Sequence, residues 1–307
     1  MSVAHPDLSV EIAGLTLQNP IMSASGTFGY AMEYEDYVDL SALGAIVTKA
    51  VTLEPREGNP PPRVRETPAG MLNAIGLQNP GAKVFIREKL PALREFGVPV
   101  IVNISGRTVD EFASLAEMLS VEGVDMLEVN ISCPNVEDEG MAFGVDCDMT
   151  GRLTEAVRAA TDLPIIVKLS PNVTDITVIA RAAEEAGADA LSLINTLLGM
   201  SIDVEHRRPH LGNATGGLSG PAIRPVAVRM VHQVAQAVDL PLIGMGGVMN
   251  ATDALELILA GATGVAVGTA NFVEPAAMEQ VIRGLADYCR RHQVKRITEL
   301  VGAVETG

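Results

Sequence analysis

Eight short apolar runs recur along the chain, and each stops at or near a polar residue or a glycine. They cover residues 20–24, 45–48, 98–102, 125–129, 164–167, 190–194, 241–245 and 264–267. Between the later runs, apolar residues recur at three- and four-residue spacing, which is typical of amphipathic helices. The spacing predicts helices over 108–120, 150–161, 174–186, 224–238 and 251–260, with Asp110 and Thr174 as N-caps of the first and third.

This alternation of strand and helix predicts an α/β fold with a parallel sheet. The runs are almost continuously apolar, as expected when helices cover both faces of the sheet. Eight strand–helix units favour a single (β/α)₈ barrel domain over residues 1–307. The alternative, a doubly wound open sheet, normally has fewer strands per domain and a glycine-rich turn after its first strand.

Two further features belong to the predicted barrel. Residues 10–17 contain two short strand-like stretches, and we expect a hairpin that plugs the lower end of the barrel. Three connections, 54–81, 132–149 and 196–221, are much longer than the usual few residues and leave the C-terminal ends of strands. Loops of this length inside a compact domain are usually lids or binding loops.

Composition narrows the functional classes. The chain has 307 residues, 48% of them apolar, which is ample for a buried core, and a net charge of −16 argues against a nucleic-acid partner. No run approaches the roughly 18 apolar residues of a membrane span, and no secretory signal is visible. Three cysteines without framework spacing fit a reducing cytoplasm, and without a CxxC pair we predict no metal site.

Glycines follow the last two predicted strands, as Gly246 and Gly247 and then Gly268 before Thr269. Glycine permits close backbone approach, so that successive N–H groups can point at an anion. Barrels often bind phosphate with the loops after strands seven and eight. The glycines therefore predict a phosphate site, with tight turns that bind no ligand as the alternative.

Two lysines, Lys49 and Lys168, come directly after buried strands. A lysine in such a place is costly unless it meets an anion or an acceptor, although it can also snorkel to solvent. Because both strand ends point at the same mouth of the barrel, we predict that one lysine faces an anionic cofactor and the other an anionic substrate.

Five asparagines are predicted at the same mouth. Asn103, Asn130 and Asn195 end strands, and Asn73 and Asn135 lie in the long connections. An amide side chain offers two donors and an acceptor, which match the edge of a heterocyclic imide. A single asparagine is more often a turn or capping residue, but five at one cavity favour a planar, amide-rich ligand.

One cysteine, Cys133, stands three residues beyond Asn130, at the start of a loop over the mouth. There it could act as a base or a nucleophile, since the reactivity of a thiol depends on a lowered pKa. No histidine is near in sequence to form a Cys–His pair, so proton abstraction is at least as plausible as covalent catalysis. A buried structural thiol is the alternative.

Six segments resemble the dihydroorotate dehydrogenase family, and the resemblance extends from about residue 8 to residue 275. The segments are 73–81, 130–135, 167–172, 194–199, 216–221 and 244–247. The resemblance implies a barrel that binds FMN and oxidises (S)-dihydroorotate to orotate in pyrimidine biosynthesis.

The same resemblance implies roles for individual residues. Cys133 falls on the general base that removes a proton from C5 while hydride passes from C6 to flavin N5, and a cysteine there resembles the soluble class. The positions that contact orotate are Lys49, Asn73, Ala74, Ile75, Gly76, Leu77, Asn130, Asn135, Asn195 and Thr196. The FMN positions are Ser25, Lys49, Ala50, Asn103, Asn130, Lys168, Ile194, Gly220, Gly246, Gly247, Gly268 and Thr269.

Segments 73–81 and 168–172 resemble the NAD⁺-linked branch of that class. The resemblance then implies a partner subunit that carries FAD and a [2Fe–2S] cluster, and a heterotetramer with two copies of each chain. This chain has no GxGxxG after its first strand and no cysteine cluster, which agrees with a partner. The alternatives are a fumarate-linked homodimer, a related FMN barrel acting on another pyrimidine or carbonyl compound, and a non-catalytic scaffold subunit.

Overall fold

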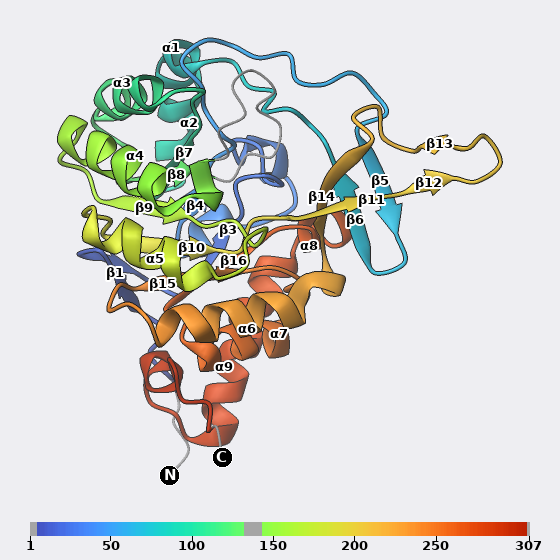
Figure 1. Cartoon of the computed structure of the whole chain (residues 1–307). Coiled ribbons are helices and arrows are strands. Elements are labelled where there is room, and N and C mark those ends of the chain that lie inside the picture. The colour runs from blue at the N-terminus through green and yellow to red at the C-terminus, as the bar shows by residue number, and fades with distance from the viewer. Residues whose placement is uncertain (1–4, 132–142, 306–307) are drawn as a thin grey trace.

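A computed structural model describes residues 5–131 and 143–305 of the chain. Cys133 and Asn135 therefore lie outside the described residues. The central element is a sheet of eight parallel strands (Figure 1). In chain order they are β3 (Ile21–Ser23), β4 (Ile46–Val47), β7 (Val100–Ile104), β8 (Met126–Asn130), β9 (Ile165–Lys168), β10 (Ala190–Leu193), β15 (Leu242–Met245) and β16 (Gly264–Val267).

The sheet closes on itself as a barrel. Each strand pairs in parallel with the next one along the chain, β16 pairs with β3, and a bridge from Met22 to Ala45 joins β3 to β4. The predicted (β/α)₈ barrel is confirmed, and each apolar run contains or overlaps one strand. A doubly wound sheet would reverse its strand order partway, and this order does not reverse.

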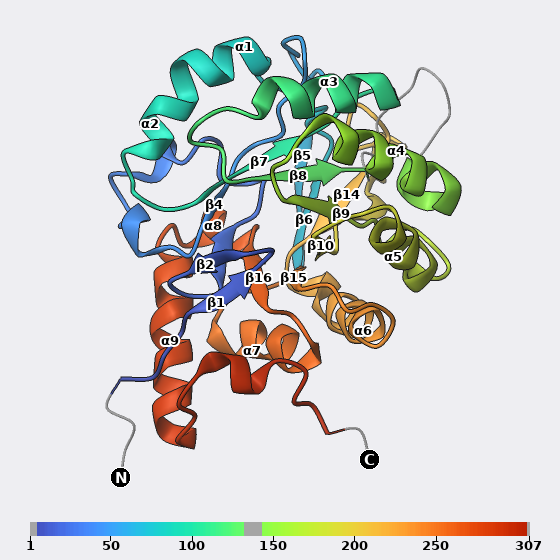
Figure 2. The ribbon, with the colours of Figure 1, turned by 90° about the vertical axis from the view of Figure 1, so that its left-hand side faces the viewer.

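Helices surround the barrel (Figure 2). They are α1 (Ala82–Val84), which runs through a π-helical turn (Phe85–Lys89) into α2 (Leu90–Arg94), then α3 (Val109–Leu119), α4 (Cys147–Ala160), α5 (Ile176–Glu185), α6 (Arg224–Ala235), α7 (Ala251–Ala260), α8 (Ala270–Val273) and α9 (Ala277–His292). Short 3₁₀ turns occupy Met32–Tyr34, Leu40–Ala42, Phe143–Val145, Pro221–Ile223 and Ile297–Leu300. Within the described ranges, no helix combines the length and apolarity needed to cross a membrane.

The predicted helices are present, but both predicted N-caps were wrong. Thr108 caps α3 and Asp175 caps α5, each through a side-chain oxygen that accepts a hydrogen bond from an N–H of the first turn. Asp110 lies inside the first turn of α3, where its negative charge interacts favourably with the positive end of the helix dipole. Thr174 stands one residue too early to reach the free N–H groups.

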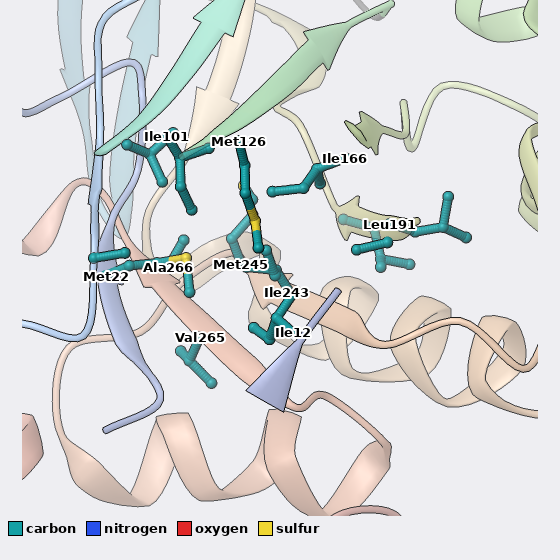
Figure 3. Packing of buried hydrophobic residues seen from close by; sticks show 14 of the residues in the cluster. Ile12, Met22, Ile101, Met126, Ile166, Leu191, Ile243, Met245, Val265 and Ala266 are labelled. Carbon is teal, nitrogen blue, oxygen red and sulfur yellow. The ribbon is translucent and has the colours of Figure 1, made fainter. Parts of the chain in front are cut away.

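The N-terminal hairpin covers the lower end of the barrel, as predicted. Strands β1 (Val10–Ile12) and β2 (Leu15–Leu17) pair antiparallel around a turn at residues 13–14. Ile12 is only 1% exposed, and Figure 3 shows it beside Ile243 of β15. Side chains such as Met22, Ile101 and Ile166 fill the interior above it, so the barrel is a packed core and not a pore.

A second, smaller sheet stands over the mouth of the barrel. Its four antiparallel strands run in the order β11 (Leu197–Met200), β14 (Thr215–Ser219), β6 (Gly70–Asn73) and β5 (Val64–Thr67). Beyond it, β12 (Ile202–Asp203) and β13 (Arg208–Pro209) form a two-stranded arm. The sequence had predicted only long loops here. Two of those connections instead pair with each other, which local periodicity does not reveal.

Candidate active site

A pocket opens between the C-terminal ends of the barrel strands and the second sheet. It encloses about 1250 Å³ of space between protein atoms, its open mouth included. The barrel supplies its floor, and residues of β6 and β14 supply part of its wall.

Most of the predicted site residues line this pocket. They are Ser25, Lys49, Ala50, Asn73, Ile75, Gly76, Leu77, Asn130, Lys168, Ile194, Asn195, Thr196, Gly220, Gly246, Gly247, Gly268 and Thr269. Two others do not. Ala74 packs instead into the small core of the second sheet, where it is 1% exposed. Asn103 lies within β7, because that strand ends two residues later than predicted, and so it sits below the mouth, fully buried.

The ammonium group of Lys168 lies on the buried side of the pocket. Lys168 ends β9 and is 4% exposed, so it does not snorkel to solvent. Its Nζ lies 3.1 Å from Ser25 Oγ and 3.5 Å from Glu128 Oε2. Ser25 and Glu128 therefore fix the position of the lysine's positive charge at the pocket floor.

The second lysine, Lys49, follows β4 on another side of the pocket and is partly buried. Burial lowers its pKa below the usual 10.5, the positive charge of Arg63 lowers the pKa further, and the carboxylate of Glu33 opposes both effects. Neighbouring positive charges make the position favourable for an anionic ligand, because such a ligand relieves their repulsion.

One charged residue of the site, Glu128 in the middle of β8, was not predicted from the sequence. It is 2% exposed, and its Oε1 accepts a hydrogen bond of 2.8 Å from Ser192 Oγ. Its Oε2 accepts from Asn103 Nδ2 and pairs with Lys168. The only available signal was a lone acid inside an apolar run, and a buried acid needs partners.

Side-chain amides from separate elements meet at the pocket. Asn195 Nδ2 donates to Asn130 Oδ1 at 3.3 Å, which joins the ends of β8 and β10. Asn73 Nδ2 donates to the carbonyl of Gly217 at 3.4 Å across the second sheet. The tertiary fold therefore brings amide groups together from positions that are distant in sequence.

The glycines after β15 and β16 give this part of the pocket a backbone surface. Gly246 and Gly247 have φ angles of 128° and 76°, and a Cβ at Gly247 would lie 2.7 Å from Arg224 Cβ. In the part of the chain that the structure describes, no hydrogen bond outside the regular helices and strands has the backbone N–H of Gly247, Gly268 or Thr269 as its donor. They remain available to an anionic ligand.

No group of three or more histidine, cysteine, aspartate or glutamate side chains suited to a metal ion occurs among residues 5–131 and 143–305. Two histidines with the HxxxH spacing that some metal sites use, His206 and His210, lie on the β12–β13 arm. His206 Nδ1 contacts Asp203 Oδ2 at 2.8 Å, and His210 Nδ1 contacts Ser201 Oγ at 3.0 Å.

The fold and the pocket together define a class: an α/β-barrel enzyme whose site at the strand C-termini suits anionic, hydrogen-bonding ligands. A family model described as dihydroorotate dehydrogenase matches residues 7–288. The chain therefore belongs to the dihydroorotate dehydrogenase family, and the resemblance drawn from its motifs is confirmed.

Individual relatives agree with this assignment over nearly their full lengths. A protein of Desulforudis audaxviator is 62% identical over 296 residues, 96% of each chain. A protein of Geotalea daltonii is 57% identical over 304 residues, 99% of this chain and all of that one. A protein of Lachnoclostridium phytofermentans is 56% identical over 297 residues, 97% and 99% of the two. Each is described as dihydroorotate dehydrogenase B (NAD(+)), catalytic subunit.

Proposed function

We propose that the protein binds FMN and oxidises (S)-dihydroorotate to orotate in pyrimidine biosynthesis. One observation carries the proposal: Lys49, Asn130, Lys168 and Asn195, from four different strand ends, line a single pocket. Dihydroorotate has a carboxylate and a cyclic imide, and ammonium and amide groups are the partners that recognise them. Membership of the dihydroorotate dehydrogenase family supports the choice of substrate.

The residues present fit FMN. The free N–H groups after β15 and β16 suit its phosphate, and Lys168 Nζ suits the N1–C2=O side of its ring, where reduction places negative charge. When bound, FMN would accept the hydride that leaves C6 of the substrate. Ser25, 3.1 Å from Lys168 Nζ, keeps this ammonium on the pocket side.

The remaining groups would hold and deprotonate the substrate. Lys49 and the amides of Asn73 and Asn195 bind its carboxylate and imide edges, and Thr196 adds a hydroxyl beside them. Cys133 takes the proton from C5 as the hydride leaves C6, so that the C5=C6 double bond forms. The role of Cys133 rests on the family resemblance, because this residue lies outside the described part of the chain.

The test is spectroscopic. The purified protein should be yellow, and its absorbance near ~450 nm should bleach when dihydroorotate is added without oxygen. Dihydrouracil, which lacks the carboxylate, should bleach it far more slowly, because a polar site rejects analogues that leave its groups unpaired. A colourless protein, or equal bleaching by both compounds, would contradict the proposal.

A variant of the proposed base separates catalysis from binding. Cys133→Ala should retain FMN and slow flavin reduction by about 10²–10⁴-fold, which is the usual effect of losing a general base. An unchanged rate would instead favour a chain that serves only as a scaffold subunit.

We further propose that electrons leave through a partner subunit that carries FAD and a [2Fe–2S] cluster, with NAD⁺ as the final acceptor. The relatives' description as catalytic subunits of an NAD⁺-linked enzyme supports this, and so does the family resemblance of segments 73–81 and 168–172. Two copies of each chain would form a heterotetramer around a homodimer of this chain. Purification of the untagged chain from its native cell should bring the partner subunit with it, and the purified complex should reduce NAD⁺ when dihydroorotate is added. Isolation of a homodimer that reduces fumarate would overturn this part of the proposal.

A further inference from the structure

A buried carboxylate lies beneath the pocket and has no place in the function proposed above. Glu128 is 2% exposed in the middle of β8 and does not line the pocket. Any effect of Glu128 on a ligand must therefore pass through its neighbours. One of these neighbours, Lys168, does line the pocket and is itself 4% exposed.

Three donors converge on this one carboxylate. Lys168 Nζ lies 3.5 Å from Oε2, Asn103 Nδ2 donates to the same oxygen, and Ser192 Oγ donates to Oε1 at 2.8 Å. An ionised carboxylate accepts at both oxygens and donates nothing, whereas an amide of the same shape carries its own N–H groups. A glutamine could keep an acceptor toward Lys168 and Asn103 and turn its N–H groups toward the Ser192 hydroxyl, so what only a carboxylate supplies here is the negative charge opposite Lys168.

The charges explain why this matters for Lys168. An ammonium group with almost no exposure is unfavourable unless an opposite charge compensates it. Within the described part of the chain, Glu128 is the carboxylate in an ion pair with Lys168. The strands fix the geometry, because Glu128 and Lys168 lie on the adjacent strands β8 and β9.

We propose that Glu128 is a positioning residue that anchors the charged Lys168 at the pocket floor and thereby sets how strongly reduced flavin is stabilised. The inference rests on the proposed FMN site. Glu128 acts only through Lys168, so removing the carboxylate weakens the effect of the lysine and has little effect where the lysine is absent.

The experiment is a double-mutant cycle read by the midpoint potential of the bound flavin. The variants are Glu128→Gln, Lys168→Met and both together, each first checked for FMN content and thermal unfolding. Lys168→Met should shift the midpoint to more negative values, because a positive charge near the reduced ring is lost. Glu128→Gln should shift it in the same direction and should add little in the Lys168→Met background.

Control variants keep the result interpretable. Glu155→Gln makes the same change on the exposed face of α4 and should leave the midpoint unchanged. Glu128→Asp keeps the charge but withdraws it by one methylene, and its midpoint should lie between those of the wild type and Glu128→Gln. If Glu128→Gln fails to fold, Glu128→Asp in the two Lys168 backgrounds decides the question in the same way.

A second measurement does not need flavin. A small amine-modifying reagent, followed by peptide mass spectrometry, measures how firmly Lys168 is held as an ammonium in the FMN-free chain. Labelling of Lys168 should be several-fold faster in Glu128→Gln than in the wild type or in Glu155→Gln. This measurement decides the question if the Glu128 variants do not retain FMN.

Two outcomes would overturn the inference while leaving the proposed function intact. One is a Glu128→Gln midpoint that is unchanged or more positive than in the wild type, which would mean that Glu128 merely offsets the lysine's charge. The other is an equal shift in both Lys168 backgrounds. A wild-type protein without FMN would instead refute the proposed function, and equal labelling of Lys168 would then also refute the anchoring role.

Discussion

A single added methyl group at Gly217 tests how precisely the second sheet positions the side chains predicted to bind the substrate. Gly217 is buried in β14 and lines the pocket. A Cβ built there lies 2.0 Å from Thr196 Oγ1 and 2.6 Å from Thr196 Cβ. Rotation of the threonine can move its hydroxyl, but it cannot move Cβ, so the backbone itself must shift.

The size of the shift follows from these distances. Ordinary contact begins at 3.4 Å, so Thr196 Cβ must retreat by roughly 0.8 Å, the difference from 2.6 Å, which is close to the ~1 Å displacement that can cost an enzyme 10²-fold. β14 lies between β11 and β6, and Gly217 pairs with Leu198 on one side and Asn73 on the other. The clash is therefore not relieved freely, and overpacking of this kind typically destabilises by about 1–3 kcal/mol.

For Gly217→Ala we expect kcat/KM for dihydroorotate to fall by about 10²-fold and the free energy of unfolding to fall by about 1–3 kcal/mol. Anaerobic stopped-flow bleaching measures the first quantity and denaturant titration the second. Gly26→Ala is the matched control, because Gly26 also lines the pocket but an added Cβ there meets no atom within 4 Å. Wild-type kinetics and stability in Gly217→Ala would refute the argument that the second sheet sets the position of Thr196.

Three further predictions concern charge and helix stability. The folded state holds the Lys49 proton less tightly than the unfolded chain does, so the free energy of unfolding should rise with pH between the lowered pKa and 10.5. Affinity for orotate should fall over the same range, because Lys49 loses its charge. Lys49→Met should remove the first trend in denaturant titrations and the second in binding titrations. Asn250→Ala should lower the free energy of unfolding by about 1 kcal/mol, because the Asn250 side chain caps α7 by accepting a hydrogen bond of 2.9 Å from the N–H of Thr252. An unchanged Tm in thermal melts would contradict a stabilising role of this cap. Gly151→Ala, inside α4, should raise stability by about 0.5–1 kcal/mol in thermal melts, since the new Cβ meets only a carbonyl oxygen 3.9 Å away; a loss of stability there would contradict the packing described.

The sequence alone predicted the barrel and most of the pocket because both depend on local signals. A strand covered on both faces is an unbroken apolar run, and the residue after it marks where the backbone leaves the barrel. Parallel strands then carry all such residues to one mouth, so Lys168, Asn130 and Gly246 could be placed together without knowledge of any contact. Asn103 was predicted at the mouth but lies below it, because β7 ends two residues later than the apolar run indicated.

Only the tertiary structure decided which distant residues face one another. The second sheet pairs Asn73 with Gly217, 144 positions apart, and periodicity along either segment carries no information about such a partner. Likewise, the sequence shows a lone acid at Glu128 but not that β8 and β9 place it against Lys168. Burial leaves a local trace in the order of residues, whereas pairing between separate segments arises only when the closed barrel brings them together.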